Sequence, residues 1–212
     1  MTYLEPHGSG FMSKYHDRIA ARVERKYFTE ARTGLLGPIE GKVLEVGIGT
    51  GVNLPFLTSA KEIVGIEPDA GMRVHLDAKI PSAPAPVTVV DGVAERLPFG
   101  AGEFDAVVAT LVLCEVTDLD QALAEIRRVL VPGGVLVFLE HVRDAGLRGL
   151  VQDLVTPLSK RVLLGCRPNR NTLDAMRDNG FTVSIAHWIP RPRPRPPANG
   201  PYFAGTATVE SS

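Results

Sequence analysis

A short apolar run that opens into three alternate glycines is the feature that most constrains the fold of this chain. Residues 42–46 read as a buried strand. Three glycines follow it at alternate positions: Gly47, Gly49 and Gly51. Glycine is required where a backbone turns tightly or must approach a ligand without an intervening Cβ. A second apolar run, residues 62–66, then ends in Glu67. Two strands joined in this way predict a Rossmann-like unit in which Glu67 accepts hydrogen bonds from ribose hydroxyls.

The spacing of the glycines and the residue before them indicate which cofactor is bound. A dinucleotide site uses G-x-G-x-x-G/A, so that a helix N-terminus meets the pyrophosphate. Here the spacing is G-x-G-x-G, and Glu45 precedes it. A carboxylate at Glu45 would repel a pyrophosphate, whereas it suits the amino group of a sulfonium amino acid. The pattern therefore favours S-adenosylmethionine (SAM) and disfavours an NAD-dependent oxidoreductase.

Three stretches carry a resemblance to a known family. The run from Glu45 to Gly51 resembles motif I of the class I SAM-dependent methyltransferases, with Ile48 where a cysteine or serine is common. Residues 94–99 and 103–108 resemble the adenine-binding stretch and fourth strand of that family, and residues 129–138 its fifth strand. The resemblance implies an α/β Rossmann-like fold. Its sheet is mostly parallel and seven-stranded, with an antiparallel C-terminal strand and helices on both faces.

The resemblance also implies which residues contact SAM and its product S-adenosylhomocysteine. The expected cofactor residues lie at the ends of successive strands: Glu45, Gly47, Gly49, Thr50, Gly51, Asn53, Glu67, Pro68, Ala94, Glu95, Thr110 and Leu111. The family often has an acidic residue for the adenine amino group at the position matched by Val93. Asp91 or backbone groups around Ala94 are the alternatives for that contact.

Strand and helix signals alternate along the chain in the manner of successive βα units. Strands are expected near residues 42–46, 62–66, 87–90, 104–109, 135–140, 181–189 and 202–209, and helices starting near Asn53, Ala70 and Leu119. Residues 13–32 predict an amphipathic helix that either lies on the core or covers the cofactor. We therefore expect an N-terminal helical lid over residues 1–40 and a methyltransferase domain over 41–212. The alternating prolines and arginines of 190–197 predict an exposed, stiff turn that could border the substrate mouth.

Composition narrows the classes of partner and site. The 212 residues carry a net charge of −1, which argues against nucleic acid as an obligatory partner. No run reaches the ~20 apolar residues that a membrane span needs, and residues 1–10 lack a secretory signal. Neither of the two cysteines is expected to have the companions of a metal site, and no H-E-x-x-H or C-x-x-C motif occurs. A metal-free, cytoplasmic monomer or homodimer acting on a small molecule is expected, without integral membrane association.

Methyl transfer from a sulfonium requires mainly that nucleophile and methyl carbon be held in line. A base is needed when the nucleophile arrives protonated. His141, with Glu140 before it, is the best candidate because it titrates near neutrality and ends the expected fifth strand. The alternative is that the pair only orients loops. Cys114 reads as a packed thiol, and no Cys-His arrangement is expected.

Three further segments resemble one branch of the family, the methyltransferase-like seven enzymes, which methylate alkyl thiols. They are residues 110–114, residues 140–142, and Gly165-Cys166 followed by Arg170. The resemblance implies a small, fairly apolar acceptor, with a thiol sulfur favoured. The alternatives are an O- or N-methyltransferase acting on a phenolic, quinone-like or secondary-metabolite substrate, and a SAM-binding module without turnover.

Overall fold

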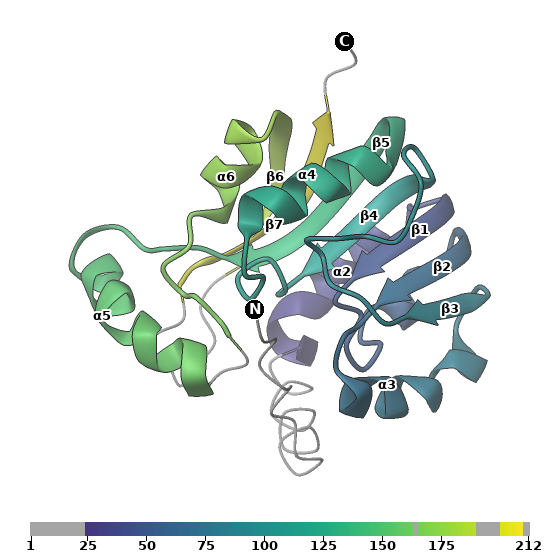
Figure 1. Ribbon diagram of the computed structural model, residues 1–212, viewed down its shortest axis with the longest axis horizontal. Helices are drawn as coiled ribbons and strands as arrows, with labels where there is room; N and C mark the ends of the chain where they lie inside the picture. Colours follow the sequence, from purple (N-terminus) through teal and green to yellow (C-terminus); the bar gives the residue numbers. More distant parts are fainter. Residues whose placement is uncertain (1–23, 163–164, 190–199, 210–212) are drawn as a thin grey trace.

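The computed structural model describes residues 24–162, 165–189 and 200–209 (Figure 1). One seven-stranded sheet organises them, in the order β3-β2-β1-β4-β5-β7-β6. The strands are β1 (Gly41–Val46), β2 (Ala60–Ile66), β3 (Val87–Val90), β4 (Phe104–Thr110), β5 (Leu130–His141), β6 (Phe181–Ile189) and β7 (Tyr202–Val209). Strands β1 to β5 pair in parallel, and β7 runs antiparallel to both β5 and β6. The predicted fold class is confirmed.

Helices cover both faces of the sheet because successive strand residues point to opposite sides. Leu44 and Val107 pack in one apolar cluster with residues of α4 (Leu119–Val129) and α6 (Thr172–Asp178). Val43 and Val108 pack in a second cluster with residues of α2 (Thr29–Leu36) and α3 (Ala70–Asp77). The near-continuous apolar runs of the central strands are what a parallel sheet buried on both faces requires.

The N-terminus of each of two helices is fixed by an aspartate. Asp69 Oδ1 accepts the Met72 N–H at 2.9 Å and begins α3. Asp118 Oδ1 accepts the Gln121 N–H at 3.1 Å and begins α4. A side-chain acceptor at this position satisfies an N–H that has no partner within the helix. Both helices begin where the sequence predicts.

The helix expected near Asn53 is confirmed in position but is much shorter than an α-helix. Only a 3-10 turn, η2 (Leu54–Phe56), forms there, and β2 begins already at Ala60. The Asn53 side chain, which precedes the turn, donates inward to Glu45 Oε1 at 2.7 Å. Strand β5 is longer than expected and begins at Leu130. The remaining strand predictions agree with the structure to within two residues.

The helix expected over residues 13–32 lies partly outside the described residues, as does the whole 190–197 segment. Its described part is a π-helical turn, η1 (Glu24–Phe28), followed by α2, which continues to Leu36. Helices α5 (Gly146–Val162) and α6 lie between β5 and β6, where no helix was predicted. The short turn η3 (Ile80–Ser82) precedes β3. Within the described ranges, no helix combines the length and apolarity that crossing a membrane takes.

Candidate cofactor and acceptor site

The predicted site residues gather at the carboxyl ends of the parallel strands. Strand order reverses between β1 and β4, because β2 and β3 lie on one side of β1 and β5 on the other side of β4. Open α/β sheets bind ligands at such a switch point, beyond the carboxyl ends of the strands. The glycine loop follows β1, Glu67 follows β2, and Thr110 and His141 end β4 and β5.

The three glycines of the loop differ in what they do. All have positive φ, at 66° for Gly47, 56° for Gly49 and 75° for Gly51. A Cβ on Gly47 would lie 2.5 Å from Val112 Cγ2, and one on Gly51 would lie 2.6 Å from Leu76 Cδ1. The nearest atom to a Cβ on Gly49 would be the Gly47 carbonyl oxygen at 3.9 Å. The fold therefore requires small residues at 47 and 51, whereas Gly49 borders open space.

Glu67 ties the glycine loop to the end of β2. Its Oε2 accepts the Gly49 N–H at 2.9 Å, and its Oε1 accepts the Asp69 N–H at 2.9 Å. Burial raises the pKa of this carboxyl, and the two backbone hydrogen bonds oppose that rise. The side chain is thus held in one orientation beside Gly49, where the sequence predicts a ribose acceptor.

Glu45 lies in a buried polar network at the ends of β1 and β4. Its Oε1 accepts from Asn53 Nδ2 at 2.7 Å, and the same Nδ2 donates to Thr110 Oγ1 at 2.9 Å. Its Oε2 is buried with no hydrogen-bond partner among the described residues. Burial raises the pKa of Glu45 to about 8. A buried carboxyl oxygen without a partner is rare, and this one suits a ligand that brings its own donor.

Arg32 completes this network and was missed by the sequence analysis. It comes from α2, its side chain is buried, and its Nη1 donates to Asn53 Oδ1 and to Thr110 Oγ1, the latter at 3.0 Å. Its charge also lowers the pKa of Glu45, against the effect of burial. No motif marks Arg32, because its place beside Glu45 depends on how α2 packs across the sheet. A cation and a carboxyl group thus lie together where three predicted cofactor residues converge.

The remaining predicted cofactor residues do not all face this region. Thr50 is buried, and its Oγ1 accepts from Lys79 Nζ at 3.3 Å. Ala94 is buried, whereas Pro68 is exposed. Glu95 Oε1 accepts the Thr117 N–H at 2.6 Å, so this carboxylate holds the entry to α4. Asp91, the suggested substitute for Val93, pairs with Arg73 at 3.2 Å.

The chain turns sharply after β4. Leu111 has a φ of 57°, the only positive value among the described non-glycine residues, and its N–H donates to the Leu139 carbonyl at 2.8 Å. Such conformations persist where the surroundings enforce them, often at functional sites. Glu140 Oε1 accepts the Val112 and Leu113 N–H groups, each at 2.8 Å. Glu140 is fully buried, and these contacts support the loop-orienting alternative for it.

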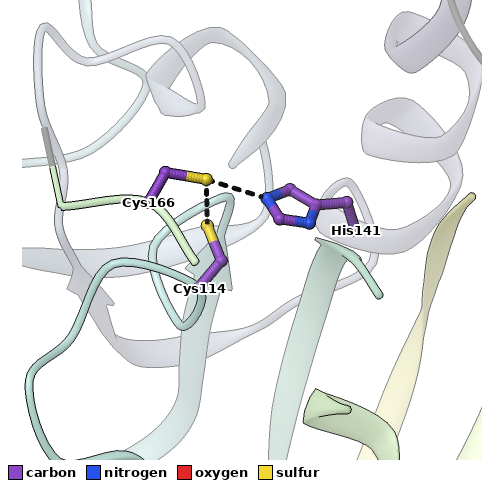
Figure 2. A group of neighbouring side chains, drawn as sticks. All are labelled: Cys114, His141 and Cys166. Atoms are coloured by element: carbon purple, nitrogen blue, oxygen red, sulfur yellow. Dashed lines mark hydrogen bonds between the residues drawn. The ribbon is translucent and has the colours of Figure 1, made fainter. Parts of the chain in front are cut away.

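His141 lies in a cluster with both cysteines of the chain (Figure 2). Its Nε2 is 3.2 Å from Cys166 Sγ, which is 3.9 Å from Cys114 Sγ. Its Nδ1 is buried with no partner among the described residues. The expectations that the cysteines lack ligating companions and that no Cys-His arrangement forms are therefore wrong. Cys114 and Cys166 are 52 residues apart in the sequence, so only the fold reveals the contact.

The arrangement fits SAM at two points. The orphaned Glu45 Oε2, with Arg32 beside it, matches the ammonium and carboxylate of an amino acid. The open space at Gly49, next to the fixed Glu67 carboxyl, accommodates close approach of a nucleoside. The residues present thus match the two chemically distinct ends of the molecule.

SAM binding at pH 7 is expected to release up to about 0.9 proton from Glu45, since a free-protein pKa of about 8 leaves this group mostly protonated there. The ligand ammonium lowers that pKa and ionises the carboxyl. Calorimetry in buffers of different ionisation enthalpy measures the release. The isosteric Glu45→Gln variant should bind more weakly and release none. Equal release by both proteins would show that the protons come from elsewhere.

Comparison with known proteins identifies the family. A family model described as a methyltransferase domain matches residues 44–138. The chain is 31% identical to the human thiol S-methyltransferase TMT1B, over 87% of this chain and 77% of that protein. It is 30% identical to human thiol S-methyltransferase TMT1A, over 79% and 70% of the two chains. A demethylmenaquinone methyltransferase from Thermobifida fusca is 33% identical over 58% of this chain and 54% of its own.

Solved structures show the same fold. A SAM-dependent methyltransferase from Thermotoga maritima, described as a possible histamine N-methyltransferase, superposes with a TM-score of 0.65 at 22% identity. The match covers 95% of this chain and 100% of that one. The glycine loop, the sheet order and these relatives all indicate a methyltransferase. The chain is a SAM-dependent methyltransferase, and it belongs to the family that includes the thiol S-methyltransferases TMT1A and TMT1B.

Proposed function

We propose that this methyltransferase transfers the methyl group of SAM to the sulfur of a small, fairly apolar thiol. The observation that carries the proposal is the His141 cluster, which puts an imidazole and two thiols at the carboxyl ends of β4 and β5. Those strand ends border the cofactor methyl in this family. The TMT1 relatives align with most of this chain, and their description as thiol S-methyltransferases supports a sulfur acceptor.

Thiol chemistry makes modest demands on such a site. SAM supplies a methyl group that is already activated by its sulfonium. The thiolate is the nucleophile, and a free cysteine thiol, with a pKa of about 8.5, forms its anion far more readily than an alcohol does. Thiol and SAM give a methyl thioether, S-adenosylhomocysteine and one proton. The chain must therefore bind both molecules in line, exclude water and accept that proton.

We assign the protein contacts by the chemistry of the SAM molecule. Arg32 and Glu45 bind the carboxylate and ammonium of the methionine end, with Asn53 and Thr110 orienting both. Glu67 accepts from the ribose hydroxyls, and the backbone around Gly49 approaches the sugar. Arg32 belongs to the described part of the predicted lid. We therefore keep closure of residues 1–40 over SAM as part of the proposal.

The acceptor side is formed by short apolar and polar segments after β4 and β5. Leu111 and Val112 follow Thr110, and Tyr202 stacks edge-on against His141 with ring centroids 5.9 Å apart. These groups suit an acceptor with little charge. His141 is the residue predicted to handle the thiol proton. The cytoplasmic location, the lack of a nucleic acid partner and the monomeric or homodimeric state stay predictions from composition.

A panel of acceptors tests the proposal directly. Purified protein is incubated with SAM and matched alkyl thiols, phenols and amines of similar size, and products are identified by mass spectrometry. We expect methyl thioethers and stoichiometric S-adenosylhomocysteine from the thiols. Methylation confined to phenols or amines would contradict the thiol proposal and show that the acceptor atom is oxygen or nitrogen. SAM binding without S-adenosylhomocysteine from any acceptor would favour a binding module.

A further inference from the structure

Three side chains with metal-ligating atoms meet at the acceptor side of the site. Cys114 lies in the segment after β4, His141 ends β5, and Cys166 precedes α6 (Figure 2). Their ligating atoms all lie within 4.8 Å of one another. Cys114 and His141 are buried, and Cys166 is partly exposed. Two sulfurs and one imidazole nitrogen make a donor set that soft divalent cations prefer in proteins.

The spacing of these atoms matches a tetrahedral ion. With Zn–S bonds of about 2.3 Å and Zn–N bonds of about 2.05 Å, a tetrahedron has S···S edges of about 3.8 Å and S···N edges of about 3.6 Å. The corresponding separations in the structure are 3.9 Å between the sulfurs and 3.2 Å between His141 Nε2 and Cys166 Sγ. An ion could therefore enter with side-chain shifts of a few tenths of an ångström for these two pairs.

We propose that Cys114, His141 and Cys166 bind a zinc ion, with the fourth coordination position open to the sulfur of the acceptor. Three protein ligands and one open position are the arrangement of catalytic zinc sites, and a Cys₂His set is one of the known forms. The metal-binding part stands on the geometry alone. The part concerning the acceptor rests on the proposed thiol function.

The backbone around the ligands is fixed by contacts that do not involve the ligating atoms. Glu140 Oε1 holds the Val112 and Leu113 N–H groups next to Cys114. The Arg167 N–H donates to the Cys114 carbonyl at 2.9 Å, which joins the Cys166 segment to the Cys114 segment. Arg170 Nη1 donates to the Leu113 carbonyl at 2.6 Å. A metal site needs this kind of support, because its ligands must be held close to the productive geometry.

Charged side chains of both signs lie around the three ligating groups. The carboxyl groups of Glu140 and Glu115 are close enough to Cys114 and Cys166 to interact with them electrostatically. The Arg167 and Arg170 guanidiniums lie against the segment after Cys114, where they donate to the Thr117 and Leu113 carbonyls. The metal site is therefore argued from the positions of the three ligating atoms.

The bound cation explains how the acceptor reaches the transfer step as a thiolate. A thiol that enters the fourth position loses its proton to solvent, because coordination stabilises the anion. The thiolate sulfur then takes the methyl group, and the uncharged thioether product is a weaker ligand that leaves. In this arrangement His141 acts as a ligand, which replaces the base role that the sequence predicted for it.

Cobalt substitution tests the metal site without relying on activity. Purified protein in a reducing agent that does not bind metals is freed of metal with a chelator and titrated with Co²⁺. Because the chain has only two cysteines, any protein thiolate-to-cobalt band must come from this cluster. We expect one Co²⁺ per chain, with near-ultraviolet charge-transfer bands and intense visible bands of a tetrahedral site. Cys166→Ser and His141→Asn should each weaken binding at least tenfold, whereas the control His75→Asn should not.

Three results would overturn the metal site. They are the absence of charge-transfer bands in the wild-type protein, unchanged bands in Cys166→Ser, and a Cys114–Cys166 disulfide that persists in reductant. Circular dichroism and S-adenosylhomocysteine affinity check that each variant is folded.

Addition of butanethiol to the cobalt protein tests the open position. We expect stronger charge-transfer absorption as a third sulfur binds, and no change with butanol. If butanethiol causes no spectral change, the acceptor does not occupy the fourth position, and this result leaves the evidence for metal binding unaffected. Failure of the proposed function is read separately, from the acceptor panel, because that result does not depend on cobalt spectra.

Discussion

Gly49→Ala is expected to weaken SAM binding at least about 100-fold, roughly 2.7 kcal/mol, while the protein stays folded. A Cβ at this position would meet no protein atom closer than 3.9 Å, so the space that it fills is the space proposed for the nucleoside. The positive φ of 56° adds a strain of about 1–2 kcal/mol, which a domain of this size tolerates. Calorimetry with S-adenosylhomocysteine measures the affinity, and urea unfolding measures the stability.

Gly51→Ala is the matched control because it lies in the same loop with a similar φ. Its Cβ would lie 2.6 Å from Leu76 Cδ1 and 2.9 Å from Leu54 Cδ1, and both leucines are fully buried. Strain and overpacking together should lower the free energy of unfolding by about 2–5 kcal/mol. The two variants thus separate a glycine that serves the ligand from one that serves the fold. Normal SAM affinity in Gly49→Ala would show that the nucleoside does not bind against this loop.

Arg32→Ala is expected to weaken SAM binding by about 1.5–3 kcal/mol, roughly 10- to 150-fold, because a charged hydrogen-bond partner of the methionine end is lost. The same change leaves Asn53 Oδ1 without its buried donor and removes one donor to Thr110 Oγ1. Arg32→Lys keeps the charge and should recover part of the affinity, since a lysine cannot donate in the fork geometry of a guanidinium.

The choice of ligand makes the Arg32 experiment specific. S-Adenosylhomocysteine carries the amino acid end, whereas methylthioadenosine has the same nucleoside and lacks it. Arg32→Ala should weaken the first and leave the second within about twofold, which is under 0.5 kcal/mol. Equal weakening of both ligands would mean that Arg32 acts through the structure of the loop. It would also exclude a direct contact with the methionine carboxylate.

Local sequence patterns were sufficient to predict the strands of the sheet. The alternation of apolar strands with turns predicted all seven strands, and the glycine run and Glu67, expected to belong to one unit, lie in hydrogen-bond contact. These features depend on residues close in sequence, where hydrophobic periodicity and backbone freedom act directly. The helix expected near Asn53 is only a 3-10 turn, and the Asn53 side chain is held by Glu45 and Thr110, contacts that local propensity does not record.

The sequence by itself determined the fold, the family and the residues that follow each strand, because each is encoded in short runs. Only the tertiary structure decided which of these residues meet. Arg32 reaches Thr110 and the Glu45 network through the packing of α2, and Cys166 lies beside His141 and Cys114 where the Arg167 N–H joins the two segments. Such contacts join segments that are far apart in the chain. Their geometry is set by how the helices cover the sheet, which no local pattern records.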